Sequence, residues 1–162
     1  MLTSQSFYTQ AISACPKGEA VARILASAIQ AIEPGSSFRR FVQRVGNSLL
    51  VDQQAYRLDE LRQIRVLGLG KAADGMSQAL VEMLGGFSYQ GLLIPKHASA
   101  QVLPHFAVFP GGHPVPDTNS LIAAQQAIHF VSGLSEQDLL ICLISGGGSA
   151  LMAAPFQGVS LV

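Results

Sequence analysis

The chain has 162 residues, of which 49% are hydrophobic and 12% are charged, and its formal net charge is zero. This length is enough for one domain with a substantial core. The neutral balance gives no reason to expect a nucleic acid or an acidic membrane surface as a partner, and no run of apolar residues is long enough for a membrane span. The charged fraction lies well below the roughly 25% of an average domain, so we expect an apolar surface that is covered by more protein or by self-association.

The first sixty residues are predicted to form helices and a small hairpin. Ala20, Ile24, Ala28 and Ile32 recur every four residues and indicate one apolar helix face. The "EPG" run at 33–35 is expected to end that helix. The predicted elements are helices over 4–14, 17–32 and 37–45, with Pro16 between the first two, and a hairpin over 48–58.

Cysteine usage and the N-terminus favour a reduced compartment. Cys15 and Cys142 lie far apart in the sequence. The first twenty residues lack the basic start and the apolar stretch of a signal peptide. We therefore expect a cytoplasmic protein with free thiols.

From residue 61 onward, short apolar segments alternate with amphipathic ones. This alternation predicts an α/β domain of three α/β/α layers with a mainly parallel, Rossmann-like sheet, and it divides the chain into 1–60 and 61–162. In such sheets ligands bind at the carboxyl ends of the strands. The predicted strands are 66–69, 91–94, 106–109 and 139–144, and the predicted helices are 71–84 and 119–134.

The last of these strands runs into the sequence "SGGGS". Glycines let a ligand approach the backbone closely, and a glycine-rich turn before a helix presents N–H groups to an anion. The alternative is a tight turn packed under a helix, but one glycine would suffice for that. We predict a phosphate-binding turn formed by Ser145, Gly146, Gly147, Gly148 and Ser149.

The segment "GLGKAADG" at 68–75 follows the first predicted strand. It fits a loose dinucleotide fingerprint, but Lys96 and His97 stand where that fingerprint requires an acidic residue. A lysine at a helix start is unfavourable unless it faces an anion. Gly70 and Lys71 are therefore candidate anion-binding residues, with a solvated surface lysine as the alternative.

A third segment, "PGGHPVPDTNS" at 110–120, is stiffened by prolines. It can hold His113 and Asp117 in fixed positions. The alternatives are a helix cap for Asp117 and a structural role for His113.

Together, "GLGKAADGM", "GGHPVPDTNS" and "LISGGGSALM" resemble, in this order and spacing, the glycerate 2-kinases of the tartronate-semialdehyde type. The resemblance covers residues 60–160 closely. It implies ATP-dependent phosphorylation of D-glycerate at the 2-hydroxyl, with a divalent metal such as Mg²⁺. By the same resemblance Lys71 matches the active-site lysine, residues 145–149 match the phosphate loop, and His113 and Asp117 match a loop expected to bind substrate.

Members of that family are much longer and contain a second half. The resemblance therefore implies that this chain corresponds to the N-terminal part of such a kinase and does not turn over glycerate alone. No P-loop pattern occurs in the sequence. The alternative function is a dinucleotide- or phosphosugar-binding domain without kinase activity.

Overall fold

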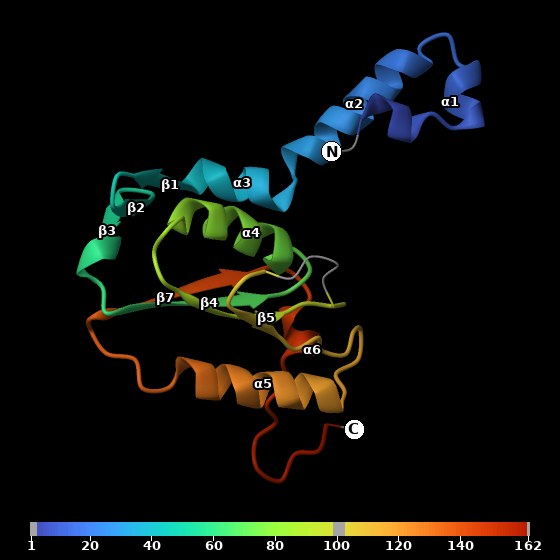
Figure 1. Cartoon of the computed structure of the whole chain (residues 1–162). Coiled ribbons are helices and arrows are strands. Elements are labelled where there is room, and N and C mark those ends of the chain that lie inside the picture. The colour runs from blue at the N-terminus through green and yellow to red at the C-terminus, as the bar shows by residue number, and fades with distance from the viewer. Residues whose placement is uncertain (1–2, 99–102, 162) are drawn as a thin grey trace.

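Four parallel strands form the central sheet of the computed structural model, which describes residues 3–98 and 103–161. The strand order is β6-β5-β4-β7. Helix α4 (Ala73–Leu84) covers one face of the sheet and α5 (Thr118–Val131) covers the other (Figure 1). The predicted three-layer architecture is confirmed. Its strands are β4 (Gln63–Leu69), β5 (Gln90–Ile94), β6 (Phe106–Val108) and β7 (Asp138–Ile144).

Each face of the sheet has its own apolar core, because successive side chains of a strand point to opposite faces. Val66 of β4 packs with Leu80 and Leu84 on the side of α4. Leu67, the next residue, packs with Ala123 on the side of α5. This burial on both faces explains why β4 is a continuous apolar run in the sequence.

The N-terminal helices project away from this body (Figure 1). They are the 3₁₀ helix η1 (Ser4–Phe7), α1 (Gln10–Ala14) and α2 (Gly18–Ala31). Within α2 the buried apolar residues are Ala22 and Ala26. The apolar face predicted for this helix lies in solvent instead, with Ile24 exposed by 68%.

The helix predicted over 37–45 is wrong beyond Phe41. Helix α3 (Pro34–Phe41) begins within the "EPG" segment, which therefore starts a helix as well as ending the preceding one. The Glu33 carboxylate accepts hydrogen bonds from the amides of Gly35 and Ser36, and Pro34 occupies the first helical position, where its missing N–H costs nothing.

After α3 the chain enters a strand rather than a further helical turn. The strand β1 (Val42–Val45) pairs with β2 (Ser48–Val51), which pairs with β3 (Gln54–Arg57), so the predicted hairpin has a third strand. The short helix η2 (Leu58–Glu60) leads into β4. Arg44 of β1 donates to the carbonyl oxygens of Met83 and Leu84 at 2.8 and 3.0 Å, and so attaches the small sheet to the C-terminus of α4.

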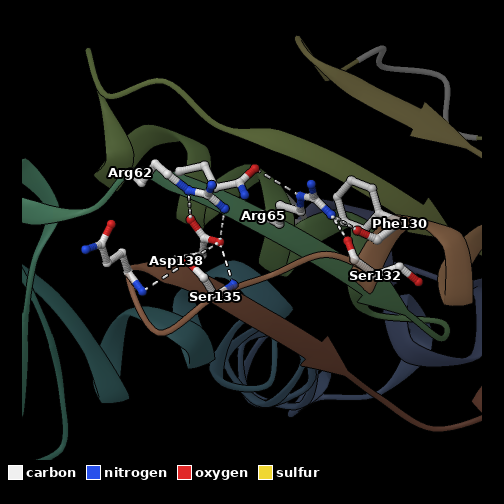
Figure 2. Close-up of polar contacts among 8 residues, drawn as sticks. Arg62, Arg65, Phe130, Ser132, Ser135 and Asp138 are labelled. Atoms are coloured by element: carbon white, nitrogen blue, oxygen red, sulfur yellow. Dashed lines mark hydrogen bonds and ion pairs between the residues drawn. The ribbon is translucent and has the colours of Figure 1, made fainter.

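At the amino end of the central sheet, two arginines tie neighbouring elements together (Figure 2). Arg62 donates to both carboxylate oxygens of Asp138 at 2.9 and 2.6 Å, which holds the pKa of that carboxyl well below its usual range. Arg65 donates to the carbonyl oxygens of Phe130 and Ser132 at the end of α5. These contacts stabilise the amino end of the sheet. Ligands of parallel sheets bind at the opposite end, beyond the carboxyl ends of the strands.

None of the helices formed by residues 3–98 and 103–161 is long and apolar enough to cross a membrane. Cys15 and Cys142 are both free thiols, and both are exposed.

Two buried serines lead to opposite stability predictions. The Ser77 hydroxyl of α4 is buried against Gly68 and has no hydrogen-bond partner among the described residues. An unpaired buried hydroxyl is destabilising, so we expect Ser77→Ala to raise the free energy of unfolding by about 1 kcal/mol. The measurement is urea unfolding of the purified chain.

The control is Ser120→Ala in α5. The Ser120 hydroxyl is equally buried but accepts hydrogen bonds from the amides of Gly112 and Asp117 at 2.9 and 3.1 Å. Its removal should lower the free energy of unfolding by about 2 kcal/mol. Equal losses in both variants would contradict the assignment of Ser77 as unpaired.

Candidate functional site

The carboxyl edge of the sheet brings together the three segments singled out in the sequence. Gly70 and Lys71 follow β4, the segment with His113 follows β6, and the glycine-rich turn follows β7. Parallel strands place their carboxyl ends on one edge, which explains this convergence of residues that are far apart in the chain. After the turn comes the single-turn helix α6 (Gly148–Leu151).

Gly147 lies at the centre of the site. It has a left-handed backbone with a φ of 90°. A Cβ at this position would lie 3.2 Å from Lys71 Cε and 3.4 Å from His113 Nε2. The ends of both side chains therefore lie over the glycine-rich turn. In the part of the chain that the structure describes, the amide N–H groups of Gly146 and Gly147 donate no hydrogen bond, so they too are available to an anion.

The turns after β4 and β7 are bonded to each other. The amide of Ser145 donates to Leu69 O at 2.9 Å, and the amide of Lys71 donates to Gly146 O at 3.2 Å. The Ser145 hydroxyl accepts from the amide of Ala72 at 2.9 Å. Lys71 is thus held beside the glycine-rich turn by backbone contacts, while its side chain is exposed.

Positive charge accumulates around His113. Burial, Lys71 and Lys96, in that order, hold the pKa of His113 below its ordinary value. Lys96 follows β5 after Pro95. Its place just after a parallel strand marks it for attention in the sequence, but the residue by itself carries little signal there. Three basic side chains at one edge favour an anionic ligand.

Asp117 has a structural contact of its own. Its carboxylate caps α5 by accepting from the amide of Ser120 at 3.1 Å, and it also accepts from Asn119 Nδ2 at 3.2 Å. These hydrogen bonds lower the pKa of Asp117. Asp117 is therefore a helix cap, which was one of the two roles considered for it. Binding of substrate by Asp117 stays a prediction.

The other members of the turn differ in exposure. Gly148 is buried, and a Cβ there would lie 3.0 Å from the Leu69 side chain. Gly146 and Ser149 are exposed. The close packing of Gly148 against Leu69 agrees with the structural alternative, a tight turn packed under a neighbouring element. The exposure of Gly146 and the open space around it match the binding interpretation.

Comparison with known proteins agrees with this arrangement. The family model described as "Domain of unknown function (DUF4147)" matches residues 20–162. The chain is 31% identical over 139 residues to glycerate 2-kinase of Pyrococcus horikoshii, covering 86% of this chain and 31% of that protein. It is 35% identical over 159 residues to rat glycerate kinase, covering 88% of this chain and 30% of that one.

Solved structures give the same result. A crystal structure of a Pyrococcus horikoshii protein superposes with a TM-score of 0.75 at 30% identity, over 91% of this chain and 33% of the other. The glycerate kinase of Thermotoga maritima superposes with a TM-score of 0.67 at 29% identity, over 85% of this chain and 30% of the other. The chain spans about a third of the length of these proteins.

The fold and the edge of the sheet define a three-layer α/β protein of Rossmann type with a glycine-rich turn after its edge strand. The family match is equally definite: the chain belongs to the DUF4147 family, whose curated relatives include glycerate kinases, and it corresponds to their N-terminal portion. The resemblance inferred from the three sequence motifs is confirmed.

Gly147→Ala tests the geometry of the turn. The new methyl group would crowd Lys71 and His113, so we expect sulfate affinity to fall by about tenfold, together with a loss of stability from the left-handed backbone. Sulfate titration and thermal unfolding of the purified chain measure the two effects.

The matched control is Gly133→Ala. Gly133 also has a positive φ, of 72°, but a Cβ there would meet nothing within 4 Å. This variant should lose stability and keep its sulfate affinity. If both variants bind sulfate as the wild type does, the convergence of Lys71 and His113 on Gly147 is not a binding site.

His113 should make anion binding depend on pH. Its pKa is lowered in the free chain, and a bound anion favours the protonated ring, so binding raises that pKa. Sulfate keeps its charge between about pH 5 and pH 8, and the sulfate affinity should fall about threefold to tenfold across this range as His113 deprotonates. His113→Gln should abolish the change, whereas His129→Gln on α5 should retain it. A pH dependence that survives in His113→Gln would assign it to another group.

Proposed function

We propose that this chain acts in the ATP-dependent phosphorylation of D-glycerate to 2-phosphoglycerate in the cytoplasm. The proposal rests on the convergence of Lys71 and His113 on Gly147, beside the amide N–H groups of Gly146 and Gly147, which donate no hydrogen bond within the described residues. It is supported by the names of relatives, glycerate 2-kinase in Pyrococcus horikoshii and D-glycerate 2-kinase in Thermotoga maritima.

Phosphoryl transfer depends on positioning and charge compensation more than on covalent chemistry. The oxygen of the 2-hydroxyl forms a bond to the γ-phosphorus, the bond from that phosphorus to the bridging oxygen of ADP breaks, and the hydroxyl proton leaves to a base. We assign the Lys71 ammonium and the N–H groups of the turn to the negative charge on the transferred phosphoryl group. His113 is assigned to the same anion or to the glycerate carboxylate.

Mg²⁺ belongs to the expected reaction, but the described residues present no site that fits it. Within residues 3–98 and 103–161, no group of three histidine, cysteine or acidic side chains is placed to hold a metal ion. The nearby carboxylate of Asp117 is occupied by the cap of α5.

The chain covers only about a third of the length of its relatives, so we do not propose that it catalyses the reaction alone. Relatives are about three times as long, and the cations at the carboxyl edge lie at the surface of this chain. A kinase site must exclude water from the transferred phosphate. We propose that this chain provides one side of the site, and that turnover needs the other two thirds of the family's length.

The test is a coupled ADP-release assay with D-glycerate, ATP and Mg²⁺. The chain alone should show no turnover. A chimera in which it replaces the matching part of the Pyrococcus horikoshii kinase should be active. In that chimera Lys71→Ala should lower kcat at least about tenfold, or about 1.4 kcal/mol of transition-state stabilisation.

The control for Lys71→Ala is Lys17→Ala, in the exposed turn before α2, since it removes a lysine remote from the sheet edge. A folded chimera without turnover would contradict the kinase proposal. Binding of sugar phosphates without ATP dependence would favour the phosphosugar-binding alternative.

A further inference from the structure

The Ser145 hydroxyl contacts the protein, whereas a phosphate-binding hydroxyl is expected to face the ligand. Its Oγ accepts a hydrogen bond from the amide of Ala72 at 2.9 Å. The same hydroxyl donates to Leu69 O at 3.4 Å. The 2.9 Å contact with Ala72 fixes Oγ against the turn that follows β4, and Leu69 O offers its proton an acceptor within the protein, at the long end of hydrogen-bond distance.

The two residues that Ser145 contacts lie on either side of Lys71. Leu69 is the last residue of β4, and Ala72 immediately precedes α4. The amide of Lys71 itself donates to Gly146 O at 3.2 Å. The backbone before, at and after Lys71 is thus attached to the turn that follows β7. A lysine has several rotatable bonds, and a fixed backbone limits the volume that its ammonium group can sample.

Gly70 allows this contact to form. Its φ is 109°, and a Cβ on Gly70 would lie 2.5 Å from both the carbonyl oxygen and Oγ of Ser145. Any side chain at position 70 would push the two turns apart. The pair of Gly70 and Ser145 therefore acts as one close contact between segments separated by more than seventy residues.

We infer that Ser145 is a positioning residue, which holds Lys71 over Gly147 and does not itself bind the anion. The inference rests on the proposed function in one respect, that Lys71 faces an anion. It replaces the direct role that the sequence pattern predicted for the Ser145 hydroxyl, and it leaves anion contact to Lys71, His113 and the backbone of the turn.

The experiment is a double-mutant cycle on the 162-residue chain, with inorganic pyrophosphate as the probe. Ser145→Ala should weaken pyrophosphate binding about tenfold, because Lys71 is no longer held in place. In the Lys71→Ala background, Ser145→Ala should change affinity by less than about twofold. A structural loss that does not act through Lys71 would weaken binding equally in both backgrounds, and that result would overturn the inference. Ser88→Ala, in the exposed loop between α4 and β5, serves as the unaffected control.

A second measurement separates this inference from the proposed function and needs no variant to fold. In the free wild-type chain, the amide of Ala72 should exchange with solvent at least about tenfold more slowly than that of Gly146, which donates no hydrogen bond within residues 3–98 and 103–161. Failure of the wild type to bind pyrophosphate would overturn the proposed function, and the role of Ser145 would then be decided by exchange alone. Fast exchange at Ala72 would overturn the inference even if pyrophosphate binds.

Discussion

The register between β4 and β7 is the constraint on which the site depends. Seven residues pair in parallel, from Gln63 with Asp138 to Leu69 with Ile144, so the turns that follow the two strands begin opposite each other. At the amino end this register is held by the ion pair of Arg62 with Asp138 (Figure 2). A slip by one residue would move every side chain of β7 to the other face of the sheet and would separate Lys71 from the glycine-rich turn.

Most of the central sheet could be predicted from sequence because its strands read as continuous apolar runs, and β4 and β5 at its centre are largely buried. The small sheet was harder. Phe38, Phe41, Val42 and Val45 have the spacing of one helix face, and periodicity alone cannot show that the chain changes from helix to strand between the second and third of them. The start of α3 was signalled by Glu33 and Pro34, since an acidic cap followed by proline begins a helix as readily as a proline ends one.

For the candidate site, the sequence predicted where the residues lie but not which of their polar groups are already hydrogen-bonded. That Lys71, His113 and Gly147 lie at one edge follows from the rule for the carboxyl ends of parallel strands. Which groups are already bonded within the protein does not follow from that rule. The hydrogen bonds of Ser145 and the cap formed by Asp117 depend on local loop geometry, and a hydroxyl in a glycine-rich sequence looks the same whether it faces a ligand or the neighbouring turn.

The low charge content has a counterpart at the same edge of the sheet. Ile144 directly precedes the turn and is 67% exposed, and Val115 in the segment with His113 is 68% exposed. An exposed apolar surface is unfavourable in water and often marks a place that another part of a protein covers. A cover there would also exclude water, which strengthens the attraction of Lys71 and His113 for an anion. The exposed apolar face of α2 lies on an arm that projects away from the sheet, so it does not cover this edge (Figure 1). A cover at the carboxyl edge would thus bury these apolar side chains and exclude water from the candidate site in a single step.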